Sequence, residues 1–299
     1  MFQRILVPLD GSRLSEASLP YAVSIGHAFS AKVVLLHVVE RGAASTIHGQ
    51  RHFTAERDAA DYLERTAREL SGRGIEAEVH VHGKAVDSVT ASLSEHSGEL
   101  DCDLMILCAH GGSDVGRILR GSIGQRVVAR AGVPVLLVRP EGAGASPGAV
   151  GRILAAVDGR PEHEQGLPVA VEIASRLRVP LRLFMAVRTK GSLTCEEGAM
   201  GRMLPGAMRE MLDVLESSAS QSLAERVDSI ARGGVEVSSQ VCRGDPAALI
   251  ASSAEVGDCL IVLGTHGKAG TAAFWAGSVA PRIARLTSRP LLLVPASGR

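Results

Sequence analysis

Gly264–Ser278 reads GTHGKAGTAAFWAGS and follows directly on an apolar run, Cys259–Leu263. An earlier stretch, CAHGGSDVGRILRGS at Cys108–Ser122, follows the apolar run Leu104–Leu107. Each pattern predicts a strand, a glycine-rich loop and the start of a helix. Four residues recur at one constant offset: His110, Gly111, Gly121 and Ser122 in the first stretch, and His266, Gly267, Gly277 and Ser278 in the second. We therefore expect one α/β unit to occur twice.

The rest of the chain follows the same repeat. Arg4–Leu9 and Val33–Val39 are apolar on both faces, as in parallel strands that helices cover on each side. Corresponding runs lie in the second half at Arg152–Val157 and Leu181–Val187. Because strands alternate with amphipathic helical stretches, the sequence predicts an α/β fold. It would contain two tandem Rossmann-like domains, each a five-stranded parallel doubly wound sheet.

A short segment separates the two units. Residues 141–150 read EGAGASPGAV, a composition typical of a linker. We therefore expect domain 1 at residues 1–140 and domain 2 at residues 151–299.

The composition argues against several classes of function. The 299-residue chain has a formal net charge of +0 and 3% aromatic residues. Nucleic acids need clustered Lys and Arg or stacking aromatics, so we expect no nucleic-acid partner. No apolar run is long enough to span a membrane and the start of the chain lacks signal-peptide features, so a cytoplasmic protein is expected. The five cysteines form no CxxC pair, which indicates reduced thiols.

The glycine-rich stretches have the residues of an anion-binding site. Glycines let the backbone approach a phosphate, and a following helix start offers free N–H groups. In a doubly wound sheet, ligands bind beyond the carboxyl ends of the strands, where the strand order reverses. Asp10 and Asp158 each follow the first strand of a unit, so we expect each to face one crevice with its glycine loop. A purely turn-forming role for both aspartates is the alternative.

On these residues the chain resembles the universal stress protein family, in its tandem two-domain form with adenine nucleotide alpha hydrolase-like domains. Nucleotide-binding members of that family carry the motif G-x2-G-x9-G-[ST]. The second copy matches the motif in full with Gly264, Gly267, Gly277 and Ser278, whereas the first copy has Cys108 in place of the first glycine. The sequence ILVPLDGS near the start of the chain also matches the first strand of the family.

The resemblance implies an adenine nucleotide, usually ATP, in each unit, and Mg²⁺ can accompany the phosphates. The family places the first-strand Asp near the nucleoside, contacts the base through the backbone at the position of Val38 or Ala186, and holds ribose and phosphates with the glycine loop. The implied residues of site 1 are Pro8, Asp10, Val38, Cys108, His110, Gly111, Gly121, Ser122 and Ile123. Those of site 2 are Ala156, Asp158, Ala186, Gly264, His266, Gly267, Gly277, Ser278 and Val279.

The resemblance also implies that the last strands of the two units pair, Val133–Val138 with Leu291–Val294. The two domains would then form an internal pseudo-dimer, and a homodimer of two chains is a further expectation. Both runs are apolar and would otherwise be exposed edges, which favours the pairing.

These features predict an ATP-binding universal stress protein that acts as a stress-response sensor or regulator, with little or slow hydrolysis. We expect no catalytic residue, because no Ser-His-Asp triad, paired acid–base carboxylates or GxSxG motif can be argued from the sequence. Two alternatives stay open. One is a nucleotide-processing enzyme of the same fold, and the other is a ligand-free scaffold with vestigial loops.

The histidines offer one more interpretation. His48 with His52 and His80 with His82 could bind a metal, but neither pair has Cys or carboxylates at zinc spacing, so no metal ligand is expected. His37 lies within an apolar run and is interpreted as a hydrogen-bonded core residue.

Overall fold

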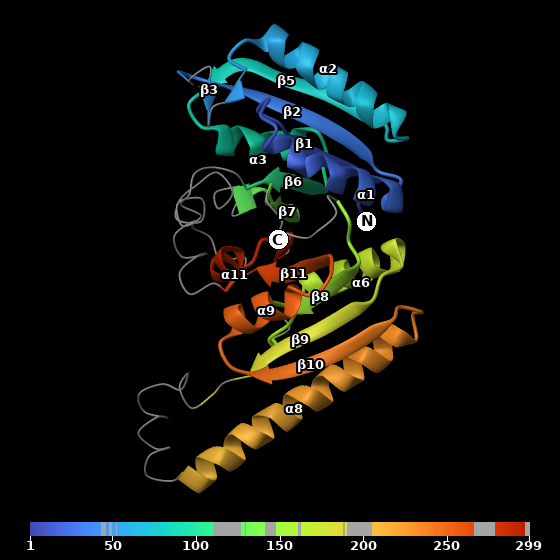
Figure 1. Cartoon of the computed structure of the whole chain (residues 1–299), viewed down its shortest axis with the longest axis vertical. Coiled ribbons are helices and arrows are strands. Elements are labelled where there is room, and N and C mark those ends of the chain that lie inside the picture. Colours follow the sequence, from blue (N-terminus) through green and yellow to red (C-terminus); the bar gives the residue numbers. More distant parts are fainter. Residues whose placement is uncertain are drawn as a thin grey trace.

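The computed structural model describes residues 1–42, 46–47, 50–51, 53–109, 127–128, 130–140, 148–160, 163–187, 189, 205–265 and 279–296. Its first half (Figure 1) contains β1 (Arg4–Pro8), η1 (Ser15–Ser18), α1 (Leu19–Phe29), β2 (Lys32–Glu40), β3 (Thr46–Ile47), β4 (Gln50–Arg51), α2 (Glu56–Gly72), β5 (Ala77–Val86), α3 (Val89–Glu99), β6 (Leu104–Cys108) and β7 (Val135–Val138). Its second half contains β8 (Arg152–Ala156), α6 (Gly166–Leu177), β9 (Leu181–Val187), α8 (Pro205–Ala231), β10 (Val237–Arg243), α9 (Pro246–Ala254), β11 (Cys259–Thr265), α11 (Ala280–Leu286) and β12 (Leu291–Pro295).

One ten-stranded sheet runs through the described structure in the order β10-β9-β8-β11-β12-β7-β6-β1-β2-β5. Within each half all neighbouring strands are parallel. β12 and β7 pair antiparallel, with Leu292 opposite Leu136. The α/β fold with five parallel strands in each half is therefore confirmed.

The strand order fixes where each half can form a crevice. In the first half the chain runs from β1 outward to β2 and β5, and then returns to β6 on the other side of β1. In the second half it runs from β8 to β9 and β10, and then returns to β11. The order therefore reverses between β1 and β6 and between β8 and β11, which are the places where such sheets bind ligands.

Helices cover both faces of the sheet. Alternation along β1 sends Ile5 and Val7 to one face and Leu6 to the other. Buried residues of α1, α2, α6 and α8 pack on the first of these faces, and those of α3, α9 and α11 pack on the second. Figure 1 shows α2 along β5 and α8 along β10, at the two outer ends of the sheet. Strands that are covered on both faces must be apolar on both faces, which is the pattern that the sequence displays.

Two predicted boundaries are wrong. The alternation of apolar and polar residues over Ile75–His82, followed by Gly83, predicts a strand that ends at Gly83. β5 instead continues to Val86, because a register shift between Val38 and Glu40 of β2 keeps the two strands paired. The glycines and the proline of Thr189–Met208 predict a loop up to Met208, whereas α8 begins at Pro205. Proline has no N–H to donate, and this makes it favourable in the first turn of a helix.

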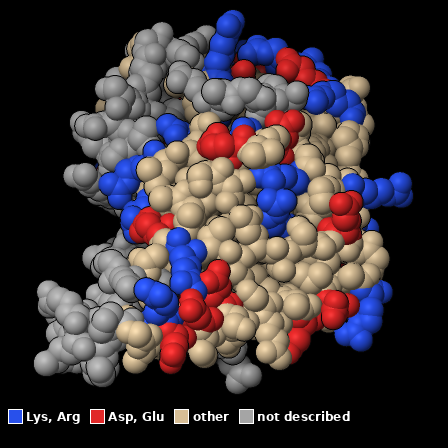
Figure 2. Space-filling model, turned by 60° about the horizontal axis from the view of Figure 1, so that its bottom comes forward, with Lys and Arg blue, Asp and Glu red and all other residues tan. Residues whose placement is uncertain are grey.

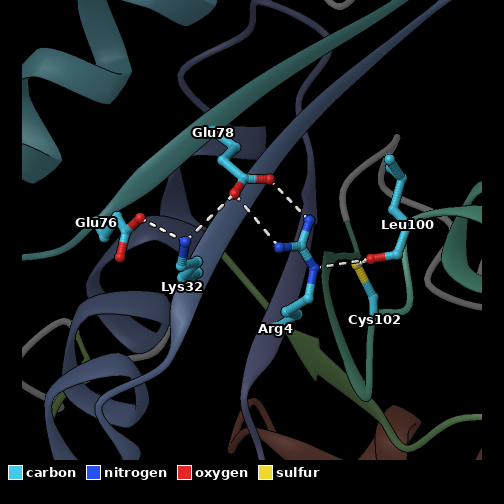
Figure 3. A network of polar contacts seen from close by, with 6 residues as sticks. All are labelled: Arg4, Lys32, Glu76, Glu78, Leu100 and Cys102. Atoms are coloured by element: carbon cyan, nitrogen blue, oxygen red, sulfur yellow. Dashed lines mark hydrogen bonds and ion pairs between the residues drawn. The ribbon is translucent and has the colours of Figure 1, made fainter.

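A charged network joins the amino ends of three strands in the first half, at the edge opposite the crevice (Figure 3). The Arg4 guanidinium donates to both carboxylate oxygens of Glu78, at 3.3 and 2.7 Å, and to the carbonyl oxygen of Leu100 at 2.8 Å. Lys32 Nζ lies 2.6 Å from Glu76 Oε1 and 3.7 Å from Glu78 Oε1. The network therefore ties β1, β2, β5 and the end of α3 together.

Replacing Glu78 with Gln tests this network. The hydrogen bond from Arg4 lowers the pKa of Glu78, and its charge and that of Lys32 act in the same direction. A carboxylate whose pKa is lowered on folding stabilises the protein at neutral pH, and this stabilisation is lost as pH falls below about 4. Because the pair is partly exposed, we expect Glu78→Gln to lower the free energy of unfolding by less than about 1 kcal/mol at neutral pH.

Chemical denaturation of both proteins across the acid range measures this effect. The difference between wild type and variant should shrink as pH falls below about 4, because the carboxylate is then protonated in the folded protein as well. Ser238 holds the place of Glu78 in the second half, so Ser238→Ala is the matched control and should give no pH-dependent difference. An equal deficit for Glu78→Gln at all pH values would contradict the assignment.

Candidate functional site

The first crevice lies where β1 and β6 end side by side. The two strands pair in register, with Ile5 opposite Leu104 and Leu6 opposite Met105. Asp10 follows β1 by two residues, and Cys108 is the last residue of β6. Burial raises the pKa of the Cys108 thiol to about 12, and the negative charge of Asp10 adds to the rise. The structure therefore brings these two predicted site residues together at the carboxyl edge.

Asp10 organises the turn that follows β1. Its Oδ1 accepts hydrogen bonds from Ser12 N at 2.9 Å and from Ser12 Oγ at 2.6 Å. Gly11 has φ +90°, and a Cβ on it would lie 2.4 Å from the Phe53 ring, so only glycine fits there. Asp10 thus has the turn-forming role of the alternative interpretation, and its place at the crevice keeps the ligand role open as a proposal.

The second crevice has a different turn. Asp158 Oδ1 accepts from Arg160 N at 3.1 Å, and Asp158 Oδ2 lies 2.6 Å from His163 Nδ1. No motif in the sequence distinguishes His163 as a site residue. Comparison of the two turns could have found it, because Ser15 holds the same place after Asp10 and its Oγ also contacts that residue, 3.4 Å from Asp10 N. In both halves, then, the fifth residue after the aspartate folds back onto it.

Gly264 packs against this second turn. A Cβ on Gly264 would lie 2.1 Å from the His163 carbonyl oxygen. A Cβ on Gly166, the first residue of α6, would lie 2.8 Å from Gly264 N. The backbone before α6 therefore lies directly on the end of β11, and glycine is needed there for chain packing. The first half has room for the half-buried Cys108 side chain at the same place.

The remaining described site residues lie at the same edges. Pro8 ends β1 and pairs with Leu36, two residues before Val38 on β2. Ala156 ends β8 and pairs with Phe184, two residues before Ala186 on β9. Val279 precedes α11 and packs on the core of the second face. The following predicted site residues lie outside the described residues: His110, Gly111, Gly121, Ser122, Ile123, His266, Gly267, Gly277 and Ser278.

The predicted core histidine behaves as expected. His37 is buried, its Nδ1 lies 2.8 Å from the Leu9 carbonyl oxygen, and its Nε2 lies 3.0 Å from the Phe53 carbonyl oxygen. His48 and His52 lie outside the described residues. In the part of the chain that the structure describes, no three His, Cys, Asp or Glu side chains are arranged to hold a metal ion.

The described surface and helices carry two further findings. On the face that Figure 2 shows, Lys and Arg lie among Asp and Glu rather than in one patch. No helix among the described residues is long and apolar enough to cross a membrane.

Fold and crevices together define a tandem Rossmann-like α/β protein. The model of the Universal stress protein family matches residues 1–139 and 150–295. The chain therefore belongs to the universal stress protein family, in its tandem form. A universal stress protein of Mycobacterium tuberculosis is 26% identical over 298 residues, covering 97% of this chain and 96% of that protein. One of Mycolicibacterium smegmatis is 24% identical over 303 residues, with the same two coverages.

A solved structure agrees with the assignment of the fold. The crystal structure of a universal stress protein from Archaeoglobus fulgidus superposes with a TM-score of 0.69 at 17% identity. The superposition covers 98% of this chain and 96% of the Archaeoglobus fulgidus chain. At this identity the likeness concerns the fold.

The close packing at Gly264 predicts a stability difference. We expect Gly264→Ala to lower the free energy of unfolding by about 1–3 kcal/mol, because the added methyl group would overlap the His163 carbonyl oxygen. Gly206→Ala is the control, since a Cβ there meets no atom within 4 Å and alanine favours the helix. Urea denaturation measures both, and unchanged stability of Gly264→Ala would rule out the close contact.

Proposed function

We propose that this chain binds an adenine nucleotide, ATP, at two crevices and acts as a stress-response sensor or regulator with little or slow hydrolysis. The proposal depends on one observation: β1 pairs with β6, and β8 pairs with β11. In each case an aspartate turn and the residue that opens the glycine-rich stretch meet at the place where the strand order reverses. Parallel sheets bind nucleotides at such places.

The role of each side chain follows from its position. The backbone at Val38 or Ala186 would contact the base, and Asp10 or Asp158 would lie near the nucleoside. The glycine-rich stretches, Cys108–Ser122 and Gly264–Ser278, would hold the ribose and would bind the phosphates with backbone N–H groups, which Mg²⁺ can assist. These assignments are carried over from the family motif and from the edge at which the described members lie.

The pairing of β7 with β12 supports a second part of the proposal. We propose that domain 1 (residues 1–140) and domain 2 (residues 151–299) act as an internal pseudo-dimer through these strands. On the same side of the sheet, the Arg176 guanidinium of α6 lies 5.7 Å from the centre of the Phe29 ring of α1. A cation over an aromatic ring adds a favourable contact between the halves.

One observation favours the alternative of a nucleotide-processing enzyme. The 2.6 Å contact of His163 with Asp158 has the form of a base that a carboxylate orients. If the second crevice hydrolyses ATP, replacing His163 with Gln should abolish phosphate release while ATP affinity is retained. We expect instead that phosphate release by the wild type is slow and is unaffected by this substitution.

Nucleotide titration of glycine variants tests the binding proposal. Isothermal titration of the wild type with ATP, with and without Mg²⁺, should give up to two equivalents. Gly121→Val should remove one and Gly277→Val the other, because a branched side chain would block the approach of a phosphate to the backbone. Gly206→Ala is the control and should bind as the wild type does.

Two results would contradict the proposal. Absence of heat and of co-purified nucleotide in the wild type favours the ligand-free scaffold. Unchanged stoichiometry in the Gly121→Val, Gly277→Val double variant would show that ATP binds elsewhere.

A further inference from the structure

Three histidines from two elements meet on the outer part of the first half. His80 and His82 stand two residues apart on β5, so their side chains share one face of the strand. His96 of α3 lies against both, with ring centres 4.9 Å from His80 and 4.8 Å from His82. His82 Nδ1 and His96 Nε2 are 3.1 Å apart, a hydrogen-bond distance. We call these three residues the histidine cluster.

The histidine cluster lies between β5 and α3. His80 pairs in register with Leu36 of β2, and His82 pairs with Val38. Both β2 residues belong to the buried core on the face that α3 covers. His96 is 4% exposed, and its Nδ1 has no hydrogen-bond partner within the described structure, although Glu99 Oε2 lies 3.5 Å away. The cluster is therefore part of the contact that holds α3 on the sheet.

The hydrogen bond between the two rings requires one proton. One imidazole must donate an N–H, and the other must accept with a lone pair. When both imidazoles are protonated, every ring nitrogen carries a hydrogen, so the acceptor is lost and two positive rings lie together. Burial lowers the pKa of His96, the charge of His80 lowers it further, Glu99 opposes this, and His82 adds a smaller lowering. The folded contact thus favours the neutral form.

Other charged groups near the histidine cluster offer little compensation. From α3, Glu99 faces it, and the side chain of Glu99 is 67% exposed. On β5, Glu78 is engaged by Arg4 and Lys32, and Lys84 is exposed. The neighbouring β2 residues, Leu36 and Val38, do not titrate. Among the described residues, the carboxylate that acts on His96 is therefore the solvent-exposed one of Glu99.

The second half provides an internal comparison. Gln240 and Cys242 of β10 pair with Phe184 and Ala186, the places that correspond to Leu36 and Val38. α3 and α9 both begin after a capping residue, Ser88 and Asp245, so Ser253 corresponds to His96. The three equivalents are thus Gln240, Cys242 and Ser253, and none is an imidazole. The fold of this unit therefore does not require histidine at these three positions.

We propose that the histidine cluster is a proton-sensitive contact that holds α3 against β5 at neutral pH and releases it in acid. The release affects the first half and spares the second. Val38 pairs with His82 and is the predicted base-contact residue, so acid would also weaken nucleotide binding at the first crevice. This last step rests on the proposed function, whereas the release itself does not.

The direction of the pH effect follows from the coupling between proton binding and the stability of the α3 contact. A base whose pKa is lowered on folding binds fewer protons in the native state than in the open state. Its contact is complete above the usual pKa of histidine, about 6.5, and weakens as pH falls below that value. Each proton taken up on opening raises the ratio of open to closed molecules by up to about tenfold for each pH unit in this range.

Hydrogen exchange of the nucleotide-free chain at about pH 7.5 and about pH 5 tests the proposal. After correction for the intrinsic exchange rates, amides of β5 and α3 in the wild type should lose protection by about tenfold or more at the lower pH. Amides of β10 and α9 should keep theirs. The variant His80→Gln, His82→Cys, His96→Ser carries the residues of the second half and should lose this pH dependence.

Two results would overturn the proposal. One is equal protection of β5 and α3 in the wild type at both pH values. The other is the same loss of protection in the triple variant. Because the measurement uses no ligand, failure of ATP binding leaves its outcome unaffected.

If the triple variant does not fold, an NMR titration of the wild-type histidines tests the proposal instead. The ring signals of His96 should shift only well below the usual pKa of histidine, about 6.5, and together with loss of the native α3 signals. Titration of His96 at the usual pKa of histidine, about 6.5, with α3 signals unchanged, would contradict the proposal.

Discussion

The antiparallel pairing of β7 with β12 is the constraint on which the rest of the architecture depends. Both strands are apolar and buried, and each would be the exposed edge of a five-stranded sheet if the halves were separate. Their pairing satisfies the backbone groups of both edges and makes one sheet of ten strands. The remaining edges, β5 and β10, carry half-buried and exposed side chains. The device that differs between the halves, the histidine cluster, lies behind one of these outer edges.

The two crevices share a plan and differ in how closely the chain packs. In each, an aspartate turn follows the first strand and the fifth residue beyond it folds back, as Ser15 or as His163. The second turn lies so close to β11 that only glycine fits at position 264, while the first leaves room for Cys108. The first glycine of the motif therefore has a packing reason in addition to its expected contact with a ligand. Backbone approach serves both purposes because glycine lacks a Cβ.

Much of this could be predicted from the sequence, because burial on both faces and strand–helix alternation leave direct patterns in it. These patterns located β1, β6, β8 and β11 and predicted that Asp10 lies at the crevice. Other features depend on how distant segments meet. His163 contacts Asp158 because the turn between them lies on the end of β11. His96 meets His80 only because α3 lies over β5. No local pattern encodes such contacts, although comparison of the two copies would have drawn attention to both places.

Hydrogen exchange with and without saturating ATP tests the central claim most directly. Nucleotide binding where the strand order reverses should protect the amides that follow β1 and β6, around Asp10 and Cys108. It should also protect the corresponding amides after β8 and β11. The amino edge of the same strands, where Arg4 and Lys32 lie, should be unaffected and serves as the control within the molecule. Protection confined to that amino edge would contradict ATP binding at the crevices. So would the absence of any change in amide protection at saturating ATP.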